Sequence, residues 1–337
     1  MAQEHIFGID LGTRSVKIYD QKYDKITQES NSAAIRNGDT VFAIGNEAYE
    51  MLERTPDNIE IVNPSRNGRI NDVLMQEAIL HILLERTTDG TGHNPTLYFS
   101  VPTDMTEIER RAYSTIAQRG RFRRSKVYMV EKPIADAVAI GIPIERTQGS
   151  IIINMGAQST EVSVIADKRP IISRMIPIGG QHFTEAIVEG IRKKNAFTVS
   201  FRTAEHLKFE LCNMSRDIGE GLTVGGLDMI SGLPRNGSVS SYNVTSCVAN
   251  QLTVLTDEIR TILERIPPQV RTNSLEEGIF LTGGSSRIPG IERFMEYRLG
   301  ISCTVSRFFE YSTAYGLKQI IDNKELQNWV YIPGKKN

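Results

Sequence analysis

The glycine turn after the first apolar run of this chain has the residue types of a phosphate-binding hairpin. Residues 8–19 predict an apolar strand, a tight turn at Gly12 and a second, alternating strand. Gly12 has no Cβ, so a phosphate can approach the backbone closely, and successive amides of such a turn form an anion-binding concavity. Asp10 ends the first strand, where its carboxylate is placed to hold Mg²⁺ through water. The pattern fits an ordinary β-hairpin as well, and by itself it does not decide between the two.

A second stretch repeats this pattern in the other half of the chain. Residues 151–164 again combine an apolar run, a glycine turn and an alternating run. Two matched hairpins indicate two similar halves that face each other. The matched pairs are Asp10 with Asn154, Gly12 with Gly156, and Ser15 with Ser159.

Two further glycine pairs precede helical patterns. Gly283 and Gly284, followed by Ser285, come after an apolar strand, and such a strand-to-helix turn suits a nucleoside. Gly179 and Gly180 precede a predicted helix over residues 181–193, whose first amides can face a phosphate. These turns extend the candidate site beyond the two hairpins.

Length and composition limit the class of function. A chain of 337 residues is too long for one ordinary core, so two halves are expected. The net charge of −1 argues against nucleic-acid binding through phosphate neutralisation. The three cysteines are far apart and suggest neither a disulfide framework nor a zinc site, which fits a reducing cytoplasm. No apolar run has the length of a membrane span or a signal segment.

The order of predicted strands and helices indicates an α/β fold with crossover helices. The first lobe is expected to cover residues 1–141, with an insertion subdomain at about 27–65, and to be completed by a C-terminal helix over 312–325. The second lobe is expected to cover 142–311, with an insertion at about 182–235. Asp104 and Glu107 are expected to form a capping box. Further helices are predicted over residues 71–86 (capped by Asn71 or Asp72), 134–140, 203–211, 245–266 and 291–299.

The sequence resembles the MreB family of bacterial actins, within the superfamily of actin, sugar kinases and heat-shock chaperone ATPases. The resemblance implies the actin-like ATPase fold, with two similar lobes, each a mixed sheet flanked by helices plus a small insertion subdomain. The matching stretches are residues 8–13, 43–64, 101–111, 127–141, 202–210, 231–235, 266–269 and 278–284.

The resemblance also implies a site for ATP or ADP with Mg²⁺, and phosphoryl transfer to water or to a hydroxyl. It places Lys208 and Glu210 at the adenine and ribose contacts, although both fit an exposed charged face as well. Arg14 either reaches the phosphates or lies on the hairpin surface. The nucleotide contacts expected from hairpins and turns are Asp10, Gly12, Thr13, Gly156, Ala157, Gln158, Gly179, Gly180, Gly283, Gly284 and Ser285.

The catalytic positions depart from the family pattern. Asn154 replaces an Asp and Lys132 a catalytic Glu, which makes the site three charge units more positive than in its relatives. Ala157, Gln158 and Ser159 replace two glycines and a Thr. A protonated lysine cannot accept a proton from water, but it can pair with a terminal phosphate. We therefore expect nucleotide binding with slow or absent hydrolysis.

Two alternatives concern the same positions. Glu131 could supply the missing base if the local register slips, but adjacent residues on an extended segment point to opposite sides. Lys132 could instead be structural, in a site that holds no nucleotide. Whether the chain is an active ATPase stays open at this stage.

The resemblance implies a cytoplasmic, nucleotide-binding cytoskeletal protein that polymerises head to tail into filaments and organises cell shape or the cell interior. Its expected partners are further copies of itself, another actin-like protein or the cell-shape machinery, and no nucleic acid. Direct membrane contact is not expected, because residues 87–95 form a polar loop without an apolar pair, and no amphipathic N-terminal helix is present. The alternatives are a small-molecule kinase of the superfamily and a non-polymerising adaptor of other actin-like filaments.

Overall fold

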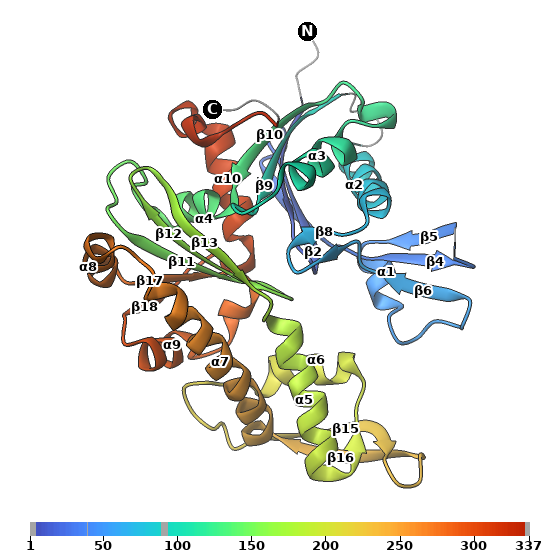
Figure 1. Cartoon of the computed structure of the whole chain (residues 1–337). Coiled ribbons are helices and arrows are strands. Elements are labelled where there is room, and N and C mark those ends of the chain that lie inside the picture. The colour runs from blue at the N-terminus through green and yellow to red at the C-terminus, as the bar shows by residue number, and fades with distance from the viewer. Residues whose placement is uncertain (1–4, 39, 89–93, 334–337) are drawn as a thin grey trace. The chain divides into compact units, whose positions relative to one another are not determined.

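The chain forms two units, and the sheets at their centres have five strands each (Figure 1). The computed structural model describes residues 5–38, 40–88 and 94–333. The first unit comprises residues 1–147, 165–173 and 310–337, and the second comprises 148–164 and 174–309. The chain therefore leaves the first unit after residue 147, returns to it for residues 165–173, and returns again at residue 310.

The first sheet has the strand order β10-β9-β1-β2-β3. β1 runs antiparallel to β2 and parallel to β9, which is in turn parallel to β10. β1 and β9 are almost wholly buried, as expected of continuous apolar runs, and Phe7, Ile9 and Phe99 have no exposed surface. The predicted strand, turn and strand at the N-terminus is thus confirmed. The bounds are β1 (Ile6–Leu11), β2 (Ser15–Asp20), β3 (Lys25–Ser30), β9 (Thr96–Val101) and β10 (Lys126–Glu131).

α2 (Val73–Thr87) begins at the cap that the sequence predicted. The Asp72 carboxylate accepts a hydrogen bond from the Met75 amide at 3.0 Å, which satisfies one of the amides that a helix start leaves without an intrahelical partner. The other helical segments of the unit are α1 (Asn46–Glu50), η1 (Gly120–Phe122), α4 (Lys132–Ile140), η3 (Phe309–Tyr311, which straddles the boundary), α10 (Ser312–Asp322) and η4 (Lys324–Trp329).

α3 (Glu107–Ala117) corrects the predicted capping box. The box is formed by Thr106 and Glu109, because Thr106 has the extended backbone and the position directly before the first helical residue. Asp104 lies too early in the chain to cap this helix and forms an ion pair with Arg69 at 2.8 Å. The helix was predicted, but its first residue was placed too early.

The insertion in the first unit is a small sheet rather than an irregular segment. Its strand order is β5-β4-β6, with both pairs antiparallel. Part of the predicted polar loop, residues 89–93, lies outside the described residues. The bounds are β4 (Ala33–Arg36), β5 (Thr40–Ile44), β6 (Ile59–Val62) and the short pair β7 (Ser65–Arg66) and β8 (Arg69–Ile70).

The second sheet has the order β13-β12-β11-β17-β18, with β11, β17 and β18 parallel. A three-stranded sheet of order β14-β15-β16 forms the insertion. The bounds of the strands are β11 (Ser150–Met155), β12 (Thr160–Ala166), β13 (Arg169–Ile176), β14 (Phe197–Thr198), β15 (Gly221–Asp228), β16 (Pro234–Ser240), β17 (Ile279–Thr282) and β18 (Cys303–Val305). The helical segments are α5 (Gly180–Asn195), α6 (Phe201–Leu211), α7 (Ser241–Leu263), α8 (Pro268–Glu277), η2 (Gly284–Arg287) and α9 (Ile291–Leu299).

α7 starts four residues earlier than the apolar periodicity predicted. Ser240 caps it by accepting a hydrogen bond from the Asn243 amide at 3.4 Å, and this polar first turn carries little hydrophobic signal. One face of the helix is buried, including Val248, Leu252 and Leu255. None of the helices in the described part of the chain combines the length and apolar character that crossing a membrane requires.

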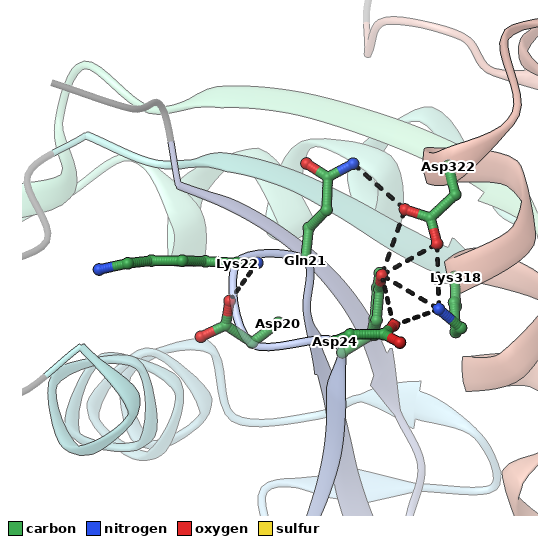
Figure 2. A network of polar contacts seen from close by, with 7 residues as sticks. Asp20, Gln21, Lys22, Asp24, Lys318 and Asp322 are labelled. Atoms are coloured by element: carbon green, nitrogen blue, oxygen red, sulfur yellow. Dashed lines mark hydrogen bonds and ion pairs between the residues drawn. The ribbon is translucent and has the colours of Figure 1, made fainter. Parts of the chain in front are cut away.

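A polar network holds α10 against β2 and the β2–β3 turn of the first unit (Figure 2). The Tyr19 hydroxyl donates to Asp322 at 3.0 Å and to Asp24 at 3.2 Å. Lys318 forms ion pairs with both carboxylates, and Gln21 donates to Asp322 at 3.2 Å. Burial and the Asp322 carboxylate raise the pKa of Tyr19. The network therefore ties the C-terminal helix to the first sheet.

Candidate functional site

The two glycine turns have the same backbone geometry. The Gly12 amide donates to the Ser15 carbonyl at 3.1 Å, and the Gly156 amide donates to the Ser159 carbonyl at 2.9 Å. A Cβ on either glycine would lie 2.8 or 2.9 Å from the same carbonyl oxygen, which is too close for any other residue. The repeat read from the sequence is thus confirmed as a repeat of structure.

Asp10 lies at the centre of a buried charged cluster in the first unit. Its Oδ1 accepts hydrogen bonds from Ser100 Oγ at 2.8 Å and from Lys132 Nζ at 2.9 Å. Its Oδ2 lies 3.5 Å from Lys17 Nζ. The Asp10 side chain is only 4% exposed, and those of Lys17 and Lys132 are 8% and 17% exposed. One carboxylate is therefore held by two ammonium groups and a hydroxyl.

Despite burial, the neighbouring ammonium groups and the Ser100 hydroxyl lower the pKa of Asp10. Burial alone would raise this pKa. The charges of Lys132 and Lys17 and the hydrogen bonds from Lys132 and Ser100 together outweigh the effect of burial. They lower the pKa of Asp10 to about 2. The carboxylate is therefore ionised at neutral pH and belongs to the ion-pair cluster.

Sequence reasoning missed Lys17 and Ser100, although strand register points to both. Lys17 is directly opposite Asp10 in the β1–β2 pair, and Ser100 is opposite it in the β1–β9 pair. Residues opposite each other in neighbouring strands point to the same face of the sheet. Counting outward from the Gly12 turn would have found Lys17.

Lys132 and Glu131 have different neighbours. Lys132 is the first residue of α4 and reaches Asp10, whereas Glu131 ends β10 and precedes the helix. Burial raises the pKa of Glu131, and the charge of Arg110 lowers it in part. Glu131 also acts on Tyr331, whose pKa it helps to raise. The register slip that would bring Glu131 to the position of Lys132 does not occur in this structure.

Thr13 and Arg14 are both engaged within the first unit. The Thr13 hydroxyl accepts a hydrogen bond from the Gly68 amide at 2.9 Å. The Arg14 guanidinium lies over the ring of Tyr49, 4.7 Å from its centroid, in a cation–π contact. Arg14 thus faces α1, and its expected phosphate contact stays a prediction.

In the second unit the hairpin turn packs on the start of α5. The Gly156 carbonyl accepts from the Gly180 amide at 3.0 Å and from Ser285 Oγ at 3.1 Å. The Ala157 carbonyl accepts from the Gln181 amide at 2.7 Å. The structure thereby brings together three turns that the sequence showed separately, those at Gly156, Gly180 and Ser285.

The remaining predicted positions flank this junction. Gln158 Nε2 donates to Gln181 Oε1 at 2.8 Å, so this side chain is directed toward the first turn of α5. Asn154 lies on β11 opposite Thr282 of β17, directly before Gly283 and Gly284. Ser159 is buried at the end of the turn. These residues are therefore close to the junction, while their contact with a nucleotide stays a prediction.

Lys208 and Glu210 lie in different surroundings. The buried Lys208 ammonium donates to the Gly180 carbonyl and to Thr184 Oγ1, both at 2.8 Å. Glu210 is exposed, and its Oε1 lies 4.0 Å from Nδ1 of His206. Lys208 thus supports the first turn of α5, a role that its sequence position alone did not indicate.

The surroundings of Asp10 do not suit the Mg²⁺ ion that the sequence led us to expect. Mg²⁺ binds carboxylate oxygens and water, whereas both oxygens of Asp10 face ammonium groups. Across residues 5–38, 40–88 and 94–333, no group of three or more His, Cys, Asp and Glu side chains could hold a metal ion. With two ammonium groups already in contact with Asp10, this position favours an anion over a further cation.

Solved structures with a similar fold give the fold class of this chain. The solved structure of MreB5 of Spiroplasma citri bound to ADP matches this chain with a TM-score of 0.89 at 25% identity, over 97% of this chain and 98% of that one. A MamK double helical filament structure matches with a TM-score of 0.78 at 16% identity, over 95% and 99% of the two chains. The chain has the actin-like fold.

The sequence comparisons give the family. The model of the MreB/Mbl protein family matches residues 4–328. The cell shape-determining protein MreB of Escherichia coli K12 is 30% identical over 88% of this chain and 88% of its own length. This chain therefore belongs to the MreB/Mbl family, as the resemblance implied.

Proposed function

We propose that this protein is a nucleotide-binding cytoskeletal actin of the cytoplasm, which polymerises head to tail into filaments and hydrolyses ATP slowly or not at all. One observation carries the proposal. The chain keeps both glycine turns, whereas the residue at the position of the catalytic Glu is Lys132, which pairs with Asp10.

Nucleotide binding is supported in each unit separately. The turn at Gly12 leaves no room for a Cβ, and the turn at Gly156 is locked to the N-terminal end of α5. Helix N-termini and turns with aligned amides attract phosphate groups. The similar MreB5 of Spiroplasma citri was solved with ADP bound. The ligand we propose is therefore ATP or ADP.

Weak hydrolysis follows from the chemistry of Lys132. An ammonium group has three donors and no acceptor, so it cannot take a proton from an attacking water. The ion pair with Asp10 keeps Lys132 in this charged form. Loss of a positioned general base typically costs a factor of about 10²–10⁴ in rate. The protein is thus expected to retain ATP far longer than an active relative would.

Filament formation is supported by the family and by the fold. A heterologous contact that repeats without closing produces an open filament. MamK, with the same fold, was solved as a double helical filament, and MreB of Escherichia coli is a cell shape-determining protein. We infer that the partners of this chain are further copies of itself, and that its filaments organise cell shape or the cell interior.

Sedimentation and negative-stain electron microscopy of the purified full chain test polymerisation. The protein is incubated with ATP, with ADP and without nucleotide, and we expect pelleted protein and visible filaments with ATP. A monomer under every condition would contradict the proposal and favour a non-polymerising adaptor. Adding a purified actin-like relative of the same cell then shows whether the monomer joins the filaments of that partner.

A further inference from the structure

We propose that this chain binds its nucleotide without a divalent cation, because the Lys132 ammonium supplies beside Asp10 the positive charge that Mg²⁺ would supply. The inference rests on the proposed nucleotide binding and names the form of the ligand: free ATP or ADP, not its metal complex.

Both carboxylate oxygens of Asp10 already lie close to other polar groups. A Mg²⁺ site in a nucleotide-binding protein usually offers one or two carboxylates, and the ion keeps several waters and binds phosphate oxygens. Here Lys132 and Ser100 occupy Oδ1 at 2.9 and 2.8 Å, and Lys17 lies 3.5 Å from Oδ2. A hydrated metal ion would have to displace two ammonium groups to reach this carboxylate.

The cluster around Asp10 has a net positive charge. Asp10, Lys17 and Lys132 together carry one net positive charge, and their side chains are 4%, 8% and 17% exposed. Like charges repel more strongly where water is excluded, so this cluster disfavours a further cation. The same surplus attracts the phosphates of a nucleotide, and a lysine binds phosphate through charge-assisted hydrogen bonds. The cluster therefore serves an anion and excludes a divalent metal.

The second hairpin has no carboxylate at the position that matches Asp10. In the second unit the position that matches Asp10 is Asn154, whose neutral amide binds a metal or its water ligands less strongly. The second hairpin therefore offers Mg²⁺ no carboxylate at this position, and in the first unit the Lys132 ammonium lies beside Asp10.

Calorimetric titration of the purified full chain with ATP, in EDTA and in excess MgCl₂, tests the inference. We expect dissociation constants that agree within about threefold, a small difference on a scale where 1.4 kcal/mol is tenfold. Binding that is tenfold or more weaker in EDTA would overturn the inference and leave the proposed function standing. Absence of ATP binding in both solutions would overturn both.

Substitution of Lys132, with a control at Lys25, sharpens the test. Lys132→Gln removes the ammonium, and we expect ATP binding in EDTA to weaken about tenfold, as for the loss of a charge-assisted hydrogen bond. Unchanged binding would show that Lys132 does not supply the charge. Lys25→Glu, at an exposed position on β3, is the charge-changing control and should bind ATP as the wild type does.

Melting temperatures measured without nucleotide test whether the protein itself binds Mg²⁺. Lys132→Glu places a second carboxylate beside Asp10, so MgCl₂ should raise its melting temperature by several degrees, since a ligand that binds only the folded state stabilises it. For the wild type, and separately for Lys25→Glu, the melting temperature should be the same with and without MgCl₂. A wild-type melting temperature that rises with MgCl₂ as much as that of Lys132→Glu would overturn the inference. If Lys132→Glu does not fold, the wild-type titration still decides.

Discussion

The ammonium group of Lys132 lies 2.9 Å from Oδ1 of Asp10. Asp10 is two residues before Gly12, the glycine of the first hairpin turn. The resemblance to bacterial actins implies a catalytic Glu at the position of Lys132, and the pattern of the first hairpin predicted that Asp10 holds Mg²⁺ through water. In this chain the two positions form an ion pair with each other. Lys132 thus places a cation beside Asp10 where the resemblance implies an acid, and this difference is the basis of the predictions below.

Asp10→Asn should lower the free energy of unfolding by about 3–5 kcal/mol, because removing one partner leaves buried charges without compensation. Lys17 and Lys132 would then lie close together with no carboxylate between them. Urea unfolding at neutral pH measures the effect. Asp57→Asn, at an exposed position, is the matched control and should change stability by no more than about 0.5 kcal/mol.

The double variant Asp10→Asn with Lys132→Gln should be more stable than Asp10→Asn alone, since one of the uncompensated charges is also removed. Additive losses would show that the two side chains do not interact. That result would contradict the ion pair.

Gly12→Ala should destabilise the protein by about 1–3 kcal/mol, as expected for an overpacked position, and weaken ATP binding. The added Cβ would lie 2.8 Å from the Ser15 carbonyl and force the turn open. Gly225→Ala on β15 is the control, because its Cβ would meet only Asn236 Oδ1 at 3.7 Å. Unfolding and ATP titration of both variants test the turn. Normal ATP binding by a folded Gly12→Ala variant would argue that the turn does not bind phosphate.

The elements with strong local signals were predictable from the sequence. α9 was expected over residues 291–299 and occurs there, because Gly300 ends it in the left-handed conformation with a φ of 69°. The first and second hairpins were also expected, since an apolar run, a glycine and an alternating run specify them locally. The capping box of α3 was misplaced, because Asp104 and Thr106 are both good caps and only the backbone of Thr106 has the required position.

The partners of the charged residues were less predictable. Lys132 was expected to face a phosphate, and the structure adds Asp10 as its partner. The two residues are distant in sequence, and β9 brings their strands together by pairing with both β1 and β10. Likewise the structure adds the Gly180 carbonyl as a partner of the Lys208 ammonium, while the expected nucleotide contact of Lys208 stays a prediction. Such contacts depend on tertiary structure, which local patterns do not encode.

Lys208→Met should lower the free energy of unfolding by about 1–3 kcal/mol, because it removes a buried ammonium that donates to two acceptors of α5. The Gly180 carbonyl keeps its hydrogen bond from the Thr184 hydroxyl at 3.1 Å. The Lys208 ammonium donates to the Gly180 carbonyl and Thr184 Oγ1, both at 2.8 Å. Lys193→Met, at an exposed position on α5, is the control, because it removes a lysine without removing these hydrogen bonds. Equal stability of the two variants in urea would contradict the supporting role of Lys208.

His81 should make the stability of the first unit depend on pH. Burial lowers its pKa below the usual 6.5, outweighing the hydrogen bond between its Nε2 and the Ile116 carbonyl. A base whose pKa is lowered by folding binds fewer protons in the folded state, so its stabilising effect is complete above pH 6.5 and decreases as the pH falls below that value.

Urea unfolding at pH 5.5 and 7.5 measures this dependence. His81→Gln should lose less stability between the two values than the wild type loses. His206→Gln, at an exposed position on α6, should retain the wild-type dependence. An identical pH dependence in all three proteins would contradict the assignment to His81.

Phosphate release from ATP by the purified protein tests the central claim most directly. In MgCl₂ the wild type should release phosphate at a rate close to the spontaneous background, and the Lys132→Glu, Asn154→Asp double variant should release it at least about tenfold faster, since a positioned base contributes about 10²–10⁴. Lys25→Glu serves as the control for altered charge and should match the wild type. Rapid phosphate release by the wild type, with no gain in the double variant, would contradict the account.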